Sequence, residues 1–462
     1  MDKFFKLKEN GTTVKTEFMA GLTTFFAMVY ILMVNAGMFA ETGQVSYGAM
    51  YIATAISAVV GTVLIGLLAN LPLAQASGMG LNAFFVYTCC FGFGLSYANS
   101  LVLILIDGLV FVLLTVTGLR KMIFDAIPNA VRKAIPAGIG LFIAFIGLQN
   151  VDLVISDPST GVALNSFNLL GSATWASVMP LVVTVLSVIA IAVMAKKNLR
   201  GAVLWGIIGG GVLYYILGFL TVPGFAPNVS FDSPLVAFKE FGTQAFGKVF
   251  TEGFDFSAYV ATHGEANLIL VIITSALAFC LVDMFDTIGT LYGACARGNM
   301  LTEKGEVPNM DRAMLADAIA TTTGAVCGTS TVTTFVESSA GVAEGGRTGL
   351  TSMFTAIFFF IAMFLSPVAQ LIPGCATAAA LIYVGILMMA CVKDIDWHSI
   401  DEAVPAFLTL AMMPFTYNIS YGIAFGIISY VFIKLFSGKI KETKVGTWVI
   451  FALFLFMLFF TH

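Results

Sequence analysis

Long apolar stretches alternate with short polar breaks along almost the whole chain. A helix of about 20 apolar residues crosses the hydrocarbon core of a bilayer. The pattern therefore predicts fourteen transmembrane segments, at residues 18–39, 48–70, 72–93, 98–119, 134–151, 174–195, 201–221, 266–292, 312–329, 330–345, 349–371, 374–392, 403–417 and 419–436. A further apolar stretch from Trp448 to Phe460 is shorter, and we expect it to lie along the membrane interface or to insert as a partial span.

Composition narrows the class of protein. The 462-residue chain is 59% hydrophobic and 10% charged, with a mean hydropathy of +0.96. Too few polar residues are present to cover a soluble protein, which leaves an all-α polytopic membrane protein. The net charge of −4 argues against a nucleic-acid partner. The sequence has no nucleophile–base pair, phosphate-binding loop or metal-ligand spacing, so we expect no catalytic residue, metal or cofactor.

The basic residues test the count of segments, because Lys and Arg gather in cytoplasmic loops. With fourteen segments, 20 of the 22 basic residues fall on the side of the N-terminus, among them Arg120, Lys121 and Lys304. Lys239 and Lys248 fall on the other side. A miscounted segment would scramble this distribution. We therefore expect a multi-pass protein of the plasma membrane with a cytoplasmic N-terminus.

Fourteen segments divide into two halves of seven. An odd number in each half turns the halves over relative to one another, which is the condition for an inverted repeat. Residues 222–265 separate the halves and are expected to form an extracellular connector, with an amphipathic interfacial helix over Ser233 to Phe250. Residues 437–462 are expected to form a C-terminal tail that holds the short apolar stretch.

The third segment of each half is interrupted by Gly, Ser and Thr. The interruptions run from Pro72 to Phe85 and from Gly328 to Gly346. Residues 329–335 are rich in Thr and favour an extended strand, after which Ser338 could begin a helix. Two such strands could pair with each other and direct two half-helix N-termini at one central point. The alternative is that both stretches are flexible loops outside the bilayer.

Six carboxylates fall inside predicted segments, where each ionised group costs about 3 kcal/mol near the bilayer centre. They are Asp107, Asp283, Asp286, Asp317, Glu337 and Glu344. Asp283 and Asp286 are three positions apart and share a helix face with Thr290. Glu337 lies where the second strand would pass into its half-helix, and Asn82 occupies the matching position in the first half. We expect Asp283, Asp286 and Glu337 to be functional.

The other three acids have structural interpretations. Asp107 could bond a neighbouring helix. Asp317 could cap a helix or pair with Arg312 or Arg297. Glu344 lies beside Arg347, with which it could form an ion pair.

Three motifs resemble those of the nucleobase–cation symporters, most of all the AzgA-like purine permease branch, which imports hypoxanthine, guanine and adenine. The motifs run from Gln75 to Phe85, from Asp283 to Thr290 and from Thr333 to Gly349, and the likeness covers nearly the whole chain. The sequence departs from uracil permeases at Thr290, where those proteins carry a His. Proton coupling through that His is therefore excluded.

The resemblance implies a core domain that moves like an elevator against a gate domain. The core would comprise residues 1–119 and 266–371, and the gate residues 134–221 and 374–436. It also implies a homodimer in the lipid membrane that binds a purine nucleobase and couples to protons rather than Na⁺.

By motif, Asn82, Asp283, Asp286 and Glu337 match the substrate-binding positions, with Thr290 beside them. Asp283, Asp286 and Glu337 also match the positions for proton coupling. Carboxylates suit the N–H groups of a purine edge, and Phe84 could stack on the ring. The rival function is an inorganic or organic anion transporter or channel of the same fold. An anion site would favour Lys or Arg at the strand junction, where this chain has Glu337.

Overall fold

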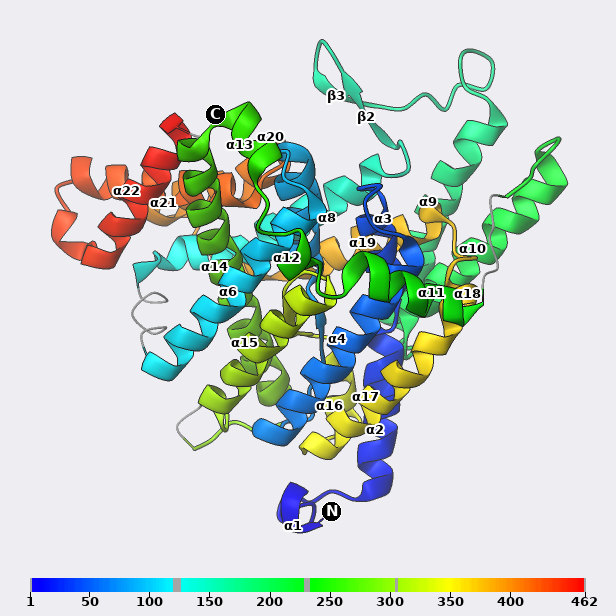
Figure 1. Ribbon diagram of the computed structural model, residues 1–462, viewed down its shortest axis with the longest axis horizontal. Coiled ribbons are helices and arrows are strands. Elements are labelled where there is room, and N and C mark those ends of the chain that lie inside the picture. Colours follow the sequence, from blue (N-terminus) through cyan, green and yellow to red (C-terminus); the bar gives the residue numbers. More distant parts are fainter. Residues whose placement is uncertain (1, 119–125, 228–232, 304–305, 461–462) are drawn as a thin grey trace.

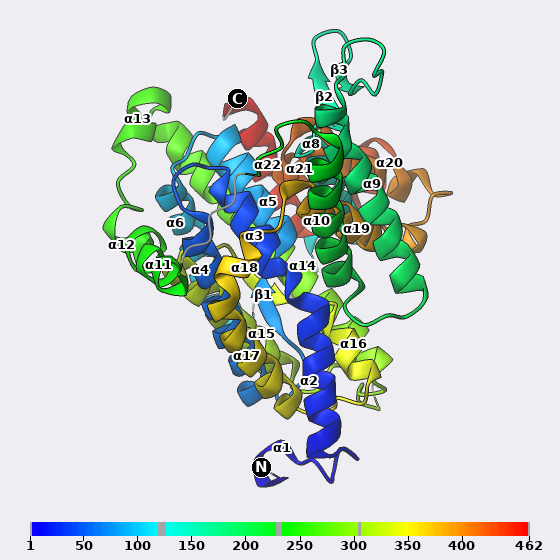
Figure 2. The ribbon, with the colours of Figure 1, turned by 90° about the vertical axis from the view of Figure 1, so that its right-hand side faces the viewer.

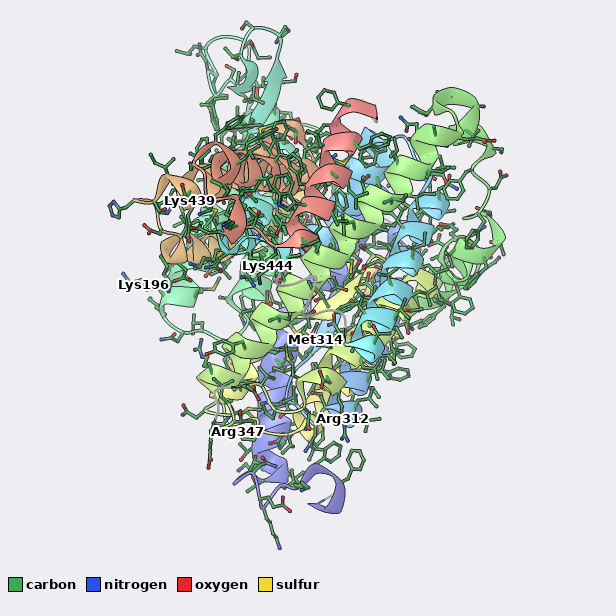
Figure 3. All side chains as sticks on the ribbon, turned by 90° about the vertical axis from the view of Figure 1, so that its left-hand side faces the viewer. Lys196, Arg312, Met314, Arg347, Lys439 and Lys444 are labelled. Carbon is green, nitrogen blue, oxygen red and sulfur yellow. The ribbon has the colours of Figure 1, made fainter. Side chains whose placement is uncertain are left out.

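A computed structural model describes residues 2–118, 126–227, 233–303 and 306–460 (Figure 1). The chain folds into a bundle of helices around two short strands that lie in its interior. Arg120, Lys121 and Lys304, which enter the argument about sidedness, lie outside the described residues. Figure 3 shows Arg312 and Arg347 near the end of the molecule that carries the first helix, while a β-hairpin lies at the opposite end.

The elements before residue 222 are α1 (Asp2–Phe5), α2 (Val14–Met28), α3 (Tyr30–Ala40), α4 (Tyr47–Leu68), β1 (Gln75–Ser77), α5 (Met79–Ala83), the π-helix η1 (Phe84–Gly92), α6 (Tyr97–Thr117), α8 (Asn129–Gln149), β2 (Val154–Asp157), β3 (Gly161–Leu164), α9 (Trp175–Lys196) and α10 (Ala202–Thr221). The connector that follows contains α11 (Pro234–Glu240), the π-helix η2 (Phe241–Ala245), α12 (Lys248–Thr251) and α13 (Ser257–His263).

The elements after the connector are α14 (Glu265–Arg297), α15 (Met310–Cys327), β4 (Val332–Thr334), α16 (Ser338–Ala343), α17 (Gly349–Ala362), η3 (Met363–Leu365), α18 (Ser366–Ala369), α19 (Gly374–Met388), η4 (Met389–Asp394), α20 (Ile400–Thr416), α21 (Ile419–Phe436), η5 (Ile440–Glu442) and α22 (Val445–Phe460). The three short elements η3, η4 and η5 are 3-10 helices.

The predicted architecture of about fourteen segments is confirmed. In the described part of the chain, ten helices are long and apolar enough to cross a membrane. Helices α15 and α20, of 18 and 17 residues, add two more segments. The broken segments at β1 and β4 complete the set, and they occupy the third and tenth places as expected. Helix α14 has 33 residues and runs further at its C-terminal end than the predicted segment 266–292.

Strands β1 and β4 pair antiparallel, although they are far apart in the sequence. Gln75 lies opposite Thr334, and Ser77 lies opposite Val332. The strands have three residues each and are wholly buried. The pair satisfies backbone groups that lipid would leave without partners. Figure 2 shows β1 in the middle of the bundle. The loop alternative is therefore wrong, because both interruptions form ordered, buried structure.

Each strand leads into a half-helix, and the two half-helices differ in length. Gly78 precedes α5, and a Cβ atom at Gly78 would come within 2.8 Å of the Thr333 side chain. A larger residue there would push the strands apart. Helix α5 continues directly into η1. By contrast, α16 has six residues and begins after Glu337.

The long helices pack in two groups. Helices α2, α4, α6, α15 and α17 contact one another around the strand pair, and helices α8, α9, α10, α19, α20 and α21 contact one another beside it. Close crossings depend on small residues. A Cβ atom at Gly349 of α17 would lie 2.0 Å from the carbonyl oxygen of Gly66 in α4. Helix α14 contacts members of both groups.

The connector differs from the sequence prediction. Instead of one amphipathic helix over Ser233 to Phe250, the chain forms α11, η2 and α12, with a break at Phe246 and Gly247. Gly247 has a positive φ of 71°, which ends any continuous helix. Glu240 of α11 accepts a hydrogen bond from Ser46 at 2.7 Å, which fastens the connector to the start of α4.

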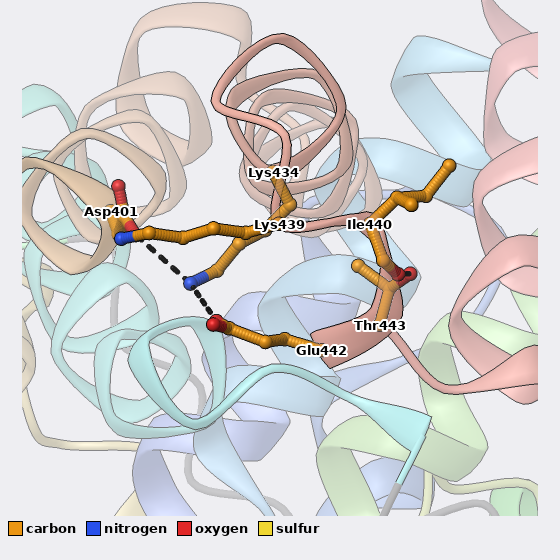
Figure 4. Close-up of polar contacts among 6 residues, drawn as sticks. All are labelled: Asp401, Lys434, Lys439, Ile440, Glu442 and Thr443. Atoms are coloured by element: carbon orange, nitrogen blue, oxygen red, sulfur yellow. Dashed lines mark hydrogen bonds and ion pairs between the residues drawn. The ribbon is translucent and has the colours of Figure 1, made fainter.

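The C-terminal stretch forms the 16-residue helix α22, which packs against α21 and α14. Ile450, Phe454 and Met457 face the protein interior and are buried. Ion pairs hold the turn before α22 (Figure 4). Lys434, in the last turn of α21, contacts Asp401 at 2.9 Å and Glu442 at 2.7 Å.

Candidate functional site

The junction between β4 and α16 brings a carboxylate to the edge of the buried strand pair. Residues 328–335 are all buried, whereas Val336 is 53% exposed and Glu337 is half-buried. The hydroxyl group of Tyr30, a fully buried side chain of α3, donates a hydrogen bond of 2.6 Å to Glu337 Oε1. Tyr30 therefore holds one carboxylate oxygen of Glu337 in place.

Asp286 on α14 is the second acid of the candidate site at the junction between β4 and α16. Its carboxylate is half-buried and close enough to Glu337 for the two groups to interact electrostatically. Thr290 lies one turn further along α14 and is 6% exposed. The association of Asp286 with Glu337 in one substrate site stays a prediction. Two carboxylates that share a site in a medium of low dielectric favour a ligand that brings N–H donors or a proton.

Asp283 has different surroundings, although it shares a helix face with Asp286. Its side chain is fully buried and contacts Thr321 of α15 at 3.2 Å. The acids that act on it are Asp317, Asp107 and Asp286. Asp283 therefore lies in a deeper group of acids than the Asp286–Glu337 pair.

Asn82 and Phe84 are both buried in the first half-helix. The Asn82 amide bonds Ser77 of β1, accepting from Ser77 Oγ at 2.7 Å and donating to the Ser77 carbonyl oxygen at 3.3 Å. The Phe84 ring packs against Phe279 of α14 with 4.7 Å between the ring centroids. Asn82 thus ties the half-helix to its strand, and the Phe84 ring is in contact with α14.

The three acids with structural interpretations have the following partners. Asp107 accepts a hydrogen bond of 3.3 Å from Thr331, just before β4. Asp317 does not pair with Arg312 or Arg297, because it accepts from Gln75, Thr287 and Thr334. Glu344 pairs with Arg200, from the loop between α9 and α10, rather than with Arg347. Arg347 donates instead to the backbone carbonyl groups of Val342 and Gly346.

Sequence reasoning missed Tyr30, Gln75 and Thr287. Tyr30 lies in an apolar run and is one of 13 Tyr in the chain, so nothing in its local pattern separates it from a packing residue. Gln75 is the first residue of β1, and its polar side chain in a buried strand was an available signal. Thr287 follows Asp286 directly, and its partner Asp317 is 30 positions away.

Two cavities of the described structure lie away from this junction. One of about 340 Å³ and one of about 310 Å³ share Gln44 and Ser96 in their walls and lie between the connector and the start of α6. Neither is lined by Asp286 or Glu337. These two cavities therefore do not support the candidate site, which rests on the arrangement of its side chains at a partly exposed junction.

Comparison with known proteins places this arrangement in a family. Residues 15–425 match the family model Xan_ur_permease, described as a permease family. The chain belongs to this permease family. It is 38% identical to the guanine/hypoxanthine permease PbuO of Bacillus subtilis, over 98% of this chain and 99% of that protein. It is 36% identical to the adenine permease AdeP of Escherichia coli, over 100% of this chain and 96% of that protein.

These relatives confirm the resemblance to the purine branch of the nucleobase–cation symporters and show a permease rather than an enzyme. Solved structures support the fold alone. The transmembrane domain of the cyanobacterial bicarbonate transporter BicA aligns with a TM-score of 0.62 at 15% identity, over 88% of this chain and 97% of that chain. The structure of SLC26A9 aligns with a TM-score of 0.61 at 12% identity, over 92% of this chain and 66% of that chain.

Proposed function

We propose that this permease imports purine nucleobases (hypoxanthine, guanine or adenine) together with protons. Relatives that match along their full length carry the names of guanine/hypoxanthine and adenine permeases. The single observation that carries the proposal is the half-buried pair of carboxylates, Asp286 and Glu337, beside the paired strands. Acceptors without a fixed cation suit a ligand that is rich in N–H donors.

The chemistry of a purine edge fits these groups. A carboxylate accepts two neighbouring N–H groups side by side, and such charge-assisted hydrogen bonds are roughly twice as strong as neutral ones. Glu337 is held by Tyr30, so it meets the base without losing much side-chain freedom. In this proposal Asp286 and Thr290 contact the base from α14, and Asn82 and Phe84 complete the substrate contacts from the first half-helix.

We further propose that transport is an elevator movement of a core against a gate. The core would be residues 1–119 and 266–371, and the gate residues 134–221 and 374–436. The two groups of packed helices support this division, because the first surrounds the strand pair and the second lies beside it. The broken segments would then travel with the substrate.

The proposed setting is the plasma membrane, with a cytoplasmic N-terminus and the connector of residues 222–265 outside. The distribution of basic residues along the sequence supports this orientation. The proposed assembly is a homodimer in which the gate helices meet. Protons are the proposed coupling ion, because carboxylates inside the helix bundle can hold them.

The rival anion transporter has weaker support. Anion transporters share the fold, as the bicarbonate transporter BicA does. An anion would need a cation in the interior. Among the described residues, the buried charged side chains are the acids Glu17, Asp107, Asp283 and Asp317 and one base, Lys434. Lys434 lies in the last turn of α21 and pairs with Asp401 and Glu442.

Uptake in cells that lack their own purine permeases tests the proposal. We expect saturable uptake of radiolabelled hypoxanthine that unlabelled guanine or adenine reduces and that uracil or sulfate does not. We expect Glu337→Gln and Asp286→Asn each to lower uptake by about 10- to 150-fold at low substrate, because each removes an acceptor of a charge-assisted hydrogen bond worth about 1.5–3 kcal/mol.

The matched control is Glu9→Gln, because Glu9 is exposed and pairs with Lys6. This variant should take up hypoxanthine at the wild-type rate. Surface labelling should show equal amounts of all four proteins in the membrane. Uptake at the wild-type rate in Glu337→Gln or Asp286→Asn would contradict the site, and uptake of sulfate or bicarbonate without purine uptake would favour the rival function.

A further inference from the structure

A second group of acids lies deep behind the paired strands, apart from the Asp286–Glu337 pair. It consists of Asp107 on α6, Asp283 on α14 and Asp317 on α15, and all three side chains are fully buried. No hydrogen bond or ion pair of the described residues brings a basic side chain to them; their hydrogen-bond donors are hydroxyl groups and one amide. Three anions together here would be too costly to bury, so the group must hold protons.

The donors are distributed unevenly over this group. Asp317 accepts three hydrogen bonds, from Gln75 Nε2 at 2.8 Å, Thr287 Oγ1 at 2.7 Å and Thr334 Oγ1 at 3.2 Å. Such a set of donors stabilises an anion. Asp317 is therefore the member of the group that is best suited to carry the negative charge.

Asp283 has the opposite balance. Among the described residues, Thr321 is the hydroxyl group that hydrogen-bonds Asp283; it lies 3.2 Å from Asp283 Oδ2 but also 3.0 Å from the Val332 carbonyl oxygen. A hydroxyl group has one hydrogen, and the carbonyl group can only accept, so Thr321 cannot fully serve Asp283. Asp283 Oδ1 receives no hydrogen bond from any described residue.

The unpartnered atoms around this group have one property in common. Asp283 Oδ1, Asp107 Oδ1 and Gln75 Oε1 are all buried, and all are acceptors. The group therefore lacks hydrogen-bond donors, and it has acceptors in excess. The carboxyl groups of Asp283 and Asp317 are within hydrogen-bonding reach of each other. A proton on Asp283 Oδ1 would complete this contact, with Asp283 donating to the Asp317 carboxylate.

We propose that the co-transported proton is carried by the Asp283–Asp317 pair, while Asp286 and Glu337 bind the base. This inference rests on the proposed function and divides its acids into two sites. In the step itself, a proton from water forms an O–H bond at Asp283 on one side of the membrane, and this bond breaks to water on the other side. The pair alternates between one negative charge and two, and no other group is consumed.

Thr287 provides the link between the two sites. It follows Asp286 in α14, and its hydroxyl group donates to Asp317 Oδ2 and also contacts Thr333 Oγ1 of β4 at 2.7 Å. Thr333 lies four residues before Glu337. A change of charge on the pair therefore acts on α14 beside Asp286 and on the strand that leads to Glu337. The titratable groups around Asp283 are Asp107, Asp286, Asp317 and Cys280.

The test uses the full-length protein in proteoliposomes and the variant Asp283→Asn, which fixes the pair in a form that cannot release a proton. We expect hypoxanthine binding within about threefold of wild type, and continued exchange of internal for external hypoxanthine. Hypoxanthine accumulation driven by a pH gradient should fall at least about tenfold. The rate at which the vesicle interior acidifies during uptake, reported by an internal pH dye, should fall by the same factor. Asp317→Asn should show the same loss of coupling if Asp283→Asn proves unstable.

Asp152→Asn is the matched control, because Asp152 is exposed after α8 and has a φ of 56°, a conformation that Asn also tolerates. It should accumulate hypoxanthine as wild type does. Loss of hypoxanthine binding in the Asp283→Asn protein would overturn the inference by placing Asp283 in the base site, and so would proton-driven accumulation at the wild-type level. Failure of the wild-type protein to bind any purine would instead overturn the proposed function.

Discussion

At the scale of single residues, the account depends on how each buried polar group is satisfied. Tyr30 and Glu337 are 307 positions apart in the sequence, yet their hydrogen bond of 2.6 Å is the only direct support that the carboxylate receives from a side chain in the described structure. The hydroxyl group does not reach the ligand in our proposal, so Tyr30 is a positioning residue. It holds Glu337 in the orientation that meets the base.

Tyr30→Phe therefore gives a graded prediction. Removal of the hydroxyl group leaves Glu337 Oε1 without its donor, which costs about 1–3 kcal/mol when the carboxylate is charged. We expect the KM for hypoxanthine to rise about tenfold, with kcat changed less, in uptake assays corrected for surface amount. Tyr292→Phe is the control, because Tyr292 is 53% exposed. An unchanged KM in the Tyr30→Phe protein would contradict the positioning role.

At the scale of elements, the sequence predicted the segments that obey simple periodic rules. The apolar runs gave the long helices, and the Thr-rich stretch at residues 329–335 gave a strand because β-branched side chains favour extended backbone. The connector was predicted to contain one amphipathic helix, whereas Gly247, with its positive φ, interrupts that helix. The hairpin of β2 and β3 was not predicted at all, since its strands have four residues each and none of those residues is buried.

The candidate site was harder to predict than the elements that carry it. Asp283 and Asp286 have the spacing of one helix face, but spacing does not reveal that Asp317 faces the first and Glu337 the second. Its neighbours in the sequence suggested an ion pair of Asp317 with Arg312 or Arg297. Asp317 instead accepts a hydrogen bond from Gln75, which lies 242 positions away. Contacts between distant segments are fixed by tertiary packing, which local patterns do not contain.

The crossing of α4 and α17 gives a prediction at this scale. A methyl group at Gly349 would collide with the backbone of Gly66, which no side-chain rotation relieves. We expect Gly349→Ala to lower the free energy of unfolding by about 1–3 kcal/mol, which thermal unfolding of the purified protein would report. Gly209 of α10 has open space around it. Gly209→Ala should be neutral or stabilising by up to about 1 kcal/mol, and equal effects of the two substitutions would contradict the packing argument.

At the scale of the whole molecule, α22 connects the proposed gate with the proposed core. It packs against α21, which lies in the proposed gate, and against α14, which lies in the proposed core. Thr447 of α22 donates a hydrogen bond of 2.5 Å to the Ala126 carbonyl oxygen, before α8. The sequence left open whether this stretch spans the membrane, and its packing shows that one face is buried in protein.

A matched pair of substitutions tests the contribution of α22. Phe454 is fully buried against the bundle, whereas Phe459 is 73% exposed. Phe454→Ala should lower the free energy of unfolding by on the order of 2 kcal/mol. Unfolding in a membrane exposes the ring to lipid rather than to water, so the substitution loses packing contacts and little hydrophobic energy. Phe459→Ala should have little effect. A similar midpoint of thermal unfolding for both variants would show that α22 does not stabilise the bundle.

The central claim is that the half-buried carboxylates at the end of the paired strands recognise a purine base. Binding of radiolabelled hypoxanthine, guanine and adenine to the purified full-length protein tests it most directly, because binding does not depend on coupling or movement. We predict saturable binding of at least one of these bases by the wild-type protein and its loss in both Glu337→Gln and Asp286→Asn. Unchanged affinity in either variant would contradict the claim, provided that a thermal unfolding transition shows the variant to be folded.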